Sequence, residues 1–134
     1  MDAALQTAAR TRALGRCEYC RFPERLAELP FHCDHIIALQ HGGRTALENL
    51  AFARCYCNRF KGPNLSGVDP LSGDVVRLFD PRRAVWEEHF QWQGARLIGR
   101  TAVARATIQA LRLNRTDALA VRALLIREGV HPAA

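Results

Sequence analysis

The sequence predicts an α+β fold, and three observations support this class. Residues 31–38 and 50–53 are short apolar segments typical of strands, and 58–61 forms a helical turn that the following Gly-Pro ends. Helical patterns occupy both ends of the chain. We therefore expect a strand pair followed by a helix, with an N-terminal helix, an additional β-hairpin and two C-terminal helices.

The first predicted element is a helix over residues 2–14. Asp2 can cap its N-terminus, alanines fill its interior, and Gly15 can end it. A tight turn at 17–20 and a connector with two prolines then lead to the first strand.

The remaining elements follow the helical turn at 58–61. Residues 64–73 are rich in Gly, Pro, Ser and Asp, which predicts an irregular loop. Thr116 and Asp117 can cap the last helix. The other expected elements are a strand at 75–79, a short helix at 82–88, a hairpin of 89–93 and 96–100, and helices at 101–113 and 116–128.

The charge of the chain favours a polyanionic partner. In 134 residues there are 18 arginines and a single lysine, Lys61, and the net charge is +6. A basic protein of this kind suits nucleic acid, although arginines paired with surface acids would give the same total. No apolar run can span a bilayer, and the N-terminus has no apolar signal-peptide segment, so a cytoplasmic protein without a membrane partner is expected.

Five cysteines in an expected intracellular chain favour metal binding over disulfides. They are Cys17, Cys20, Cys33, Cys55 and Cys57, so four of them form two close pairs. The C-x-x-C pair alone is ambiguous, because redox and structural pairs share this spacing.

Other candidate residues lie between the two cysteine pairs and just after them. Asp34 and His35 end the first apolar segment, Asn49 precedes the second, and Asn58 follows Cys57. Taken singly, each has an ordinary explanation: a satisfied histidine, a turn asparagine or a helix cap. Their order and spacing together are harder to explain in that way.

The series C-E-Y-C, D-H-I-I, H-G-G, E-N-L and C-N-R-F-K-G resembles the HNH endonuclease family. Its fold is the ββα-metal or His-Me finger, and Asn58 stands where many members carry histidine, an H-N-N form. The resemblance implies one nuclease domain over 1–134, with the motif core at 17–62 and an extension at 63–134.

The resemblance also implies roles for the polar residues. Asp34 and Asn58 would hold a catalytic divalent cation, His35 would be the general base, and Asn49 would tie together the loop between the strands. Two oxygen ligands favour Mg²⁺ or Mn²⁺. A histidine with an unperturbed pKa of about 6.5 suits proton abstraction from water near neutral pH.

Nucleic-acid contacts are expected from four basic side chains near the motif: Arg59, Lys61, Arg44 and Arg54. Such contacts to phosphates position a duplex without reading its sequence. The expected partner is DNA, with RNA as an alternative, and the protein would act as a monomer or a homodimer.

A structural Zn²⁺ is commonly held in this family by two C-x-x-C knuckles, but the second one is irregular here. Arg54 stands where a cysteine is expected, and Cys55 comes one residue later. Three alternatives remain open: Cys55 is the fourth ligand, Cys33 or His32 is, or zinc is lost. We favour the first, a zinc site of Cys17, Cys20, Cys55 and Cys57, with Cys33 packed as a small hydrophobe.

The predicted function is a metal-dependent HNH endonuclease that hydrolyses DNA phosphodiester bonds. The alternative is a zinc-knuckle nucleic-acid-binding protein that has lost catalysis, which the damaged knuckle supports. A third possibility is a small cysteine-rich interaction module whose positive charge is incidental.

Overall fold

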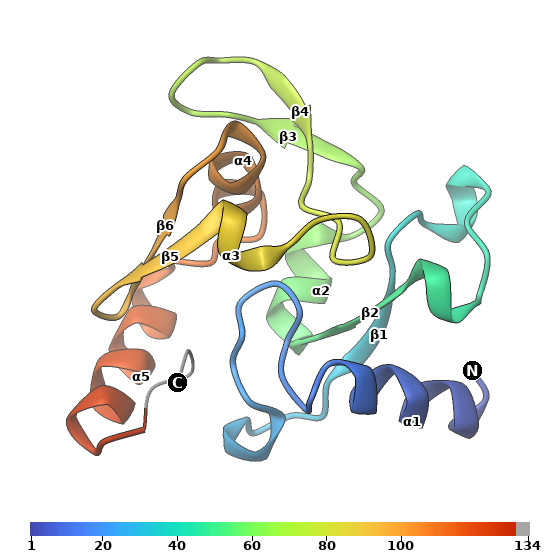
Figure 1. The fold of residues 1–134 in the computed structure, drawn as a ribbon, viewed down its shortest axis with the longest axis horizontal. Coiled ribbons are helices and arrows are strands. Elements are labelled where there is room, and N and C mark those ends of the chain that lie inside the picture. The colour runs from blue at the N-terminus through green and yellow to red at the C-terminus, as the bar shows by residue number, and fades with distance from the viewer. Residues whose placement is uncertain (131–134) are drawn as a thin grey trace.

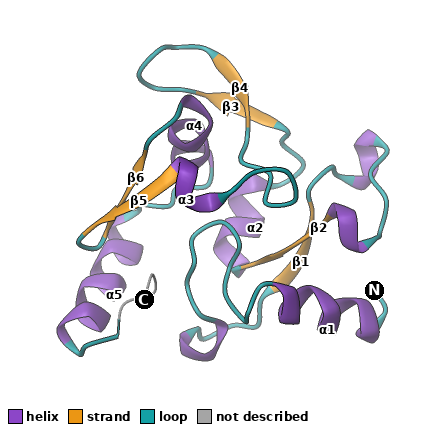
Figure 2. Cartoon of the chain, viewed as in Figure 1, coloured by secondary structure: helices purple, strands orange, loops and turns teal. Residues whose placement is uncertain are grey.

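A computed structural model describes residues 1–130, and residues 131–134 of the expected extension lie outside the described part. The α+β prediction is confirmed: helices and short antiparallel strand pairs alternate along the chain (Figure 2). The helices are α1 (Ala3–Arg12), α2 (Cys55–Lys61), α3 (Trp86–His89), α4 (Ala102–Ala110) and α5 (Thr116–Arg127). The strands are β1 (His32–His35), β2 (Leu50–Ala53), β3 (Ser66–Val68), β4 (Val75–Arg77), β5 (Phe90–Gln93) and β6 (Arg96–Gly99). Single 3-10 turns occur at Glu24–Leu26, Leu39–His41 and Leu47–Asn49.

Strands β1 and β2 and helix α2 form the expected ββα unit, called the finger below (Figure 1). The strands pair antiparallel with Asp34 opposite Ala51, and α2 packs on β1. Strand β1 is shorter than the predicted 31–38, because the chain leaves the sheet after His35. Helix α2 begins at Cys55, three residues before the predicted turn.

Helix α1 covers β2 and holds the start of the finger in place. As predicted, the Asp2 carboxylate caps it, accepting a hydrogen bond from the Ala4 backbone N–H at 2.6 Å. Near its other end, the Arg12 guanidinium donates to the carbonyls of Leu47 and Leu50, at 2.8 and 2.7 Å. The helix therefore also fastens the segment that leads into β2.

The extension carries two hairpins packed around α4. The prediction of an irregular loop over residues 64–73 is partly wrong, because residues 66–68 form strand β3, which pairs with β4. A Cβ on Gly67 would lie 3.2 Å from a Leu78 methyl group, so this glycine belongs to a tightly packed strand. Composition alone could not separate that use of glycine from its use in a loop.

A buried ion pair fixes the β3–β4 hairpin to α4. Asp69 is fully buried, and its two carboxylate oxygens each accept a hydrogen bond at 2.9 Å from the Arg105 guanidinium. These bonds hold the pKa of Asp69 well below its ordinary value. The same carboxylate accepts the Leu71 N–H, so it also closes the turn of the hairpin.

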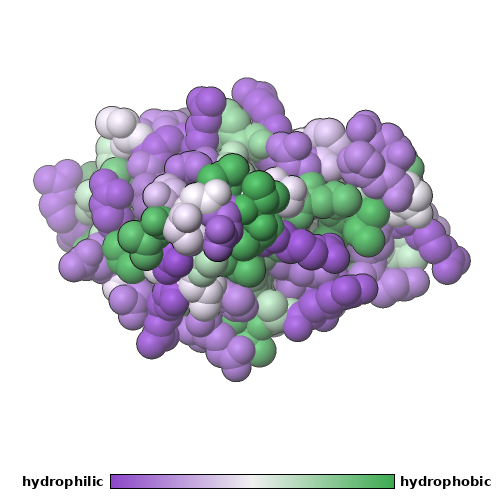
Figure 3. All heavy atoms as spheres, turned by 90° about the horizontal axis from the view of Figure 1, so that it is seen from above, coloured by the Kyte–Doolittle hydropathy of each residue, from purple (hydrophilic) through white to green (hydrophobic). Residues whose placement is uncertain are grey.

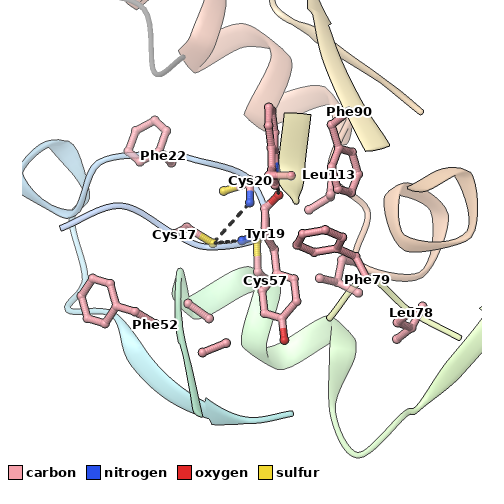
Figure 4. Packing of buried hydrophobic residues seen from close by; sticks show 14 of the residues in the cluster. Cys17, Tyr19, Cys20, Phe22, Phe52, Cys57, Leu78, Phe79, Phe90 and Leu113 are labelled. Atoms are coloured by element: carbon pink, nitrogen blue, oxygen red, sulfur yellow. Dashed lines mark hydrogen bonds between the residues drawn. The ribbon is translucent and has the colours of Figure 1, made fainter. Parts of the chain in front are cut away.

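One hydrophobic cluster includes residues of both the finger and the extension (Figure 4). Trp86 and Phe90 are buried, with ring centroids 5.1 Å apart. The Trp86 indole donates to the backbone carbonyl of Tyr19 at 2.9 Å, which joins α3 to the cysteine turn. The extension is therefore part of the packing that supports the finger.

Helix α4 is four residues shorter than the predicted 101–113, and α5 ends one residue before the predicted 116–128. Thr101 caps α4 by accepting the Ala104 N–H. The cap predicted at Thr116 is wrong, because Thr116 is already helical and Arg115 occupies the cap position without a side-chain cap bond.

Figure 3 views the molecule from the side of the β3–β4 hairpin, which lies at the top of Figure 1. Hydrophobic groups gather on this face among hydrophilic ones, and Val68, Leu71 and Val75 of the hairpin are exposed. Within residues 1–130, none of the helices has the length and apolar character needed to cross a membrane.

Candidate active site

An open cleft of about 470 Å³ lies where the end of β1 meets α2. Four of its lining residues were predicted from the sequence: Asp34, His35, Asn58 and Arg59. Asp34 and His35 are neighbours in a strand, and ideal strand geometry would direct their side chains to opposite faces. Both line the cleft because β1 ends at His35.

Asp34 is almost fully buried, with 5% exposure, and its two oxygens have different surroundings. Oδ2 accepts the Tyr19 hydroxyl at 2.9 Å and lies 3.1 Å from the Lys61 ammonium. Oδ1 has only a 3.4 Å contact with the same ammonium. Burial raises the pKa of Asp34, while Lys61 and Tyr19 act in the opposite direction. Oδ1 is thus the oxygen with more capacity for a further partner.

Lys61 is buried, a placement that does not fit the phosphate contact expected of it. Its exposure is 2%, and its ammonium also donates to the backbone carbonyls of His35 and Ile36, at 3.2 and 3.3 Å. As the last residue of α2, it ties the helix end to the end of β1. A buried ammonium needs these partners, because an unpaired charge is costly in the interior.

His35 and Asn58 complete the polar lining of the cleft. The His35 Nε2 lies 2.9 Å from the Thr45 hydroxyl, a contact within hydrogen-bonding distance. The side-chain amide of Asn58 makes no hydrogen bond within residues 1–130. A partly exposed amide without a protein partner is free to bind a ligand in the cleft.

Asn49 closes the loop between the strands. Its side chain accepts the Ile37 N–H at 2.9 Å and donates to the carbonyls of Ile37 and Arg44, at 3.0 and 2.8 Å. Gly43 lies inside this closure, and a Cβ there would stand only 1.7 Å from the Ile37 carbonyl oxygen. The loop that follows His35 therefore depends on an amide side chain and on a residue without a side chain.

Three of the four cysteines predicted to bind zinc come together. The sulfurs of Cys17, Cys20 and Cys57 lie within 4.8 Å of one another, and all three residues are buried (Figure 4). The backbone N–H groups of Tyr19 and Cys20 donate to the Cys17 sulfur at 3.4 Å. Donation of this kind stabilises a negatively charged sulfur.

Cys55 does not join this group, so the structure does not bring together the four cysteines expected to bind zinc. Cys55 and Cys57 are both in α2, and residues two apart on a helix differ by roughly 200° in direction. Cys57 faces the buried cluster, whereas Cys55 lines a separate hollow with Phe22 and Tyr56. Cys33 and His32 are also outside the group, and Cys33 is half-buried rather than packed in the core.

The three clustered sulfurs share their protons unevenly. Hydrogen bonds from Cys17 and Cys57 hold the pKa of Cys20 well below its ordinary value. Burial, together with the bond to Cys20, raises the pKa of Cys17 to about 12. Hydrogen bonds with the sulfurs of Cys17 and Cys20 raise the pKa of Cys57. The group therefore carries negative charge most readily on Cys20.

The remaining basic residues differ in their surroundings. Arg59 and Arg44 are exposed, on α2 and in the loop after the glycines. Arg54 instead lies with its guanidinium 4.0 Å from the Phe22 ring centroid and lines the hollow of Cys55 rather than the cleft. The phosphate contact expected of Arg54 does not fit this placement.

Sequence reasoning missed Tyr19, Glu18 and Thr45. Glu18 is buried, pairs with both the N–H and the carbonyl of Phe52, and forms an ion pair with Arg82. An acid and an aromatic residue between two buried cysteines were a signal for such contacts. Thr45 carried no signal, because its contact with His35 depends on the loop conformation.

Residues 17–64 match the model of the HNH endonuclease family. Comparison with curated proteins gave no match, and neither did comparison with solved structures.

We predict that Gly43→Ala destabilises the protein by about 2 kcal/mol or more, because the new methyl group would overlap the Ile37 carbonyl. Gly42→Ala is the matched control, since Gly42 has a φ of +87° but nothing within 4 Å of its Cβ position. Strain alone should cost it about 1 kcal/mol. Urea denaturation measures both, and equal losses would contradict the steric explanation.

We predict that Lys61→Met lowers the free energy of unfolding by about 3 kcal/mol, because it leaves the Asp34 carboxylate buried without its cation. The double variant with Asp34→Asn should recover part of this loss. Arg59→Met, an exposed change on the same helix, should stay within about 0.5 kcal/mol of the wild type. A stable Lys61→Met variant that binds DNA weakly would instead favour a phosphate contact.

Proposed function

We propose that this protein is a metal-dependent endonuclease that hydrolyses DNA phosphodiester bonds. The observation that carries the proposal is the convergence of Asp34, His35 and Asn58 on one open cleft, within the part of the chain that matches the HNH family model. A carboxylate and an amide oxygen can bind a divalent cation, and an imidazole can accept a proton from water; metal-assisted hydrolysis of a phosphodiester uses both functions.

The donor set fits a hard divalent cation, Mg²⁺ or Mn²⁺. Asp34 Oδ1 and the Asn58 side-chain oxygen would hold it, since both are oxygen donors and neither is saturated by protein hydrogen bonds. When bound, the cation would neutralise charge on the phosphate and on the departing 3′ oxygen. Tyr19 and Lys61 keep the other carboxylate oxygen in place.

His35 would act as the general base. Its imidazole would take a proton from the attacking water, and the contact of Nε2 with Thr45 would orient the ring. The Asn49 side chain holds the backbone at Ile37, two residues after His35, which limits movement of the base. Loop residues Thr45 and Asn49 thus hold the base in place. The proposed cation ligands Asp34 and Asn58 lie in strand β1 and helix α2.

Arg59 and Arg44 would bind the phosphates that flank the scissile bond. Arg59 lines the cleft, and Arg44 lies exposed on the loop that Asn49 closes. Contacts of this type raise affinity independently of sequence and weaken as salt concentration rises.

We propose that the cysteine cluster holds a structural Zn²⁺ through Cys17, Cys20 and Cys57. Three buried sulfurs within 4.8 Å of one another would supply three of the four ligands that structural zinc usually takes, and the N–H donors to Cys17 favour the thiolate form. Arg54, at the position of the missing cysteine, attracts the Cys20 thiolate. Its positive charge would offset the negative charge that three thiolates leave on a divalent ion.

The nuclease proposal predicts Mg²⁺- or Mn²⁺-dependent nicking of supercoiled plasmid that EDTA abolishes. His35→Ala should reduce the rate by about 10²–10⁴-fold, because the general base is lost. His41→Ala, an exposed histidine of the same loop, is the matched control and should keep the wild-type rate. Nicking that persists in His35→Ala would contradict the role of His35.

The zinc proposal predicts about one zinc per chain by elemental analysis of the purified protein. Cys57→Ser should lose the metal, whereas Cys55→Ser should retain it, because only Cys57 faces the cluster. Equal retention by both variants would contradict the three-cysteine site.

The ion pair of Asp34 supports a second candidate, a nucleic-acid-binding protein without catalysis. Lys61 already compensates the carboxylate, and a cation would have to share it. This candidate predicts salt-dependent DNA binding with no nicking at any Mg²⁺ or Mn²⁺ concentration.

A further inference from the structure

Tyr19 lies between the two cysteines of the C-x-x-C turn and is fully buried. Its polar groups contact three separate parts of the molecule. The backbone N–H donates to the Cys17 sulfur at 3.4 Å, and the backbone carbonyl accepts the Trp86 indole at 2.9 Å. The hydroxyl donates to Asp34 Oδ2 at 2.9 Å. One residue therefore links the cysteine cluster, the extension and the carboxylate of the cleft.

The hydroxyl contact is specific in its geometry. A tyrosine in the core usually needs one hydrogen-bond partner, and this ring reaches the single buried carboxylate that lines the cleft. Because Tyr19 and Lys61 both engage Oδ2, the carboxylate is held in one rotational state with Oδ1 less encumbered. The fixed direction of Oδ1 is what a cation ligand in this cleft requires.

We propose that Tyr19 is a positioning residue for Asp34 and that it connects the cysteine cluster to the catalytic-metal site. The inference rests on the proposed function of Asp34 as a cation ligand. Partners of this kind, which bind a metal ligand but not the metal, typically affect metal affinity by about 10–100-fold. The cysteine turn thus contributes to cation binding in the cleft, in addition to its contribution to stability.

The test is a Mn²⁺ titration of the full-length protein, without DNA, followed by electron paramagnetic resonance. Tyr19→Phe keeps the ring and removes the hydroxyl, and we expect its Mn²⁺ dissociation constant to rise about tenfold. Tyr56→Phe is the matched control, since Tyr56 is the only other tyrosine and its ring lies among arginines away from the cleft. Its Mn²⁺ affinity should equal that of the wild type.

Two further variants separate positioning from general stability. Leu97→Ala removes a buried side chain in β6 and should lower the melting temperature without changing Mn²⁺ affinity. Asp34→Asn should abolish Mn²⁺ binding. In plasmid nicking, Tyr19→Phe should raise the Mg²⁺ concentration at half-maximal rate about tenfold, with less than about a threefold loss of rate at saturation.

The outcomes distinguish the inference from the function on which it rests. If Asp34→Asn loses Mn²⁺ while Tyr19→Phe binds it as the wild type does, the inference is wrong and the proposed function stands. If the wild type binds no Mn²⁺, or Asp34→Asn binds it normally, the proposed site itself is wrong and the inference falls with it.

A second measurement decides the matter if Tyr19→Phe does not fold. Protein carrying 3-fluorotyrosine and the Tyr56→Phe change has its only fluorine label at Tyr19. Addition of Mg²⁺ should shift the fluorine resonance with a saturation curve that matches metal binding. A resonance that stays unchanged at saturating Mg²⁺ would overturn the link between Tyr19 and the cation site.

Discussion

The buried ion pair between Asp34 and Lys61 is the interaction on which the finger depends. It joins β1 to the last residue of α2, and the lysine also satisfies two backbone carbonyls where the strand ends. An ion pair removed from water is retained only when further hydrogen bonds complete it, as Tyr19 does here. The pair thus sets the distance between strand and helix, and with it the shape of the cleft.

The excess of arginine does not translate directly into a surface for nucleic acid. Arg105 forms an ion pair with Asp69 of the β3–β4 hairpin, and Arg82 forms one with Glu18 of the cysteine turn. Arg12 donates to the Leu47 carbonyl in the loop before β2. Arg122 is buried, with 2% exposure, and donates to the Leu113 carbonyl. A large part of the positive charge is therefore structural, and Arg59 and Arg44 are better indicators of a binding face than the net charge.

Strong local signals made much of the fold predictable from the sequence. The Asp2 cap, the strand at 50–53 and the hairpin around Gly94 are short-range features, and each is present. Strand β3 was missed because it forms only by pairing with β4, and the composition of residues 64–73 does not indicate that pairing. The burial of Lys61 and the direction of Cys55 were missed for a related reason: both depend on which face of α2 packs inward.

The contacts of the C-E-Y-C turn have a consequence for modularity. Glu18 pairs with Arg82, and the Tyr19 carbonyl accepts the Trp86 indole, so two partners of the motif lie in the extension. A copy of residues 17–64 grafted into another scaffold would carry every cleft residue. It would leave the buried Glu18 without its Arg82 ion pair and the Tyr19 carbonyl without the Trp86 donor. The region that matches the family model is therefore shorter than the unit that can be transferred intact.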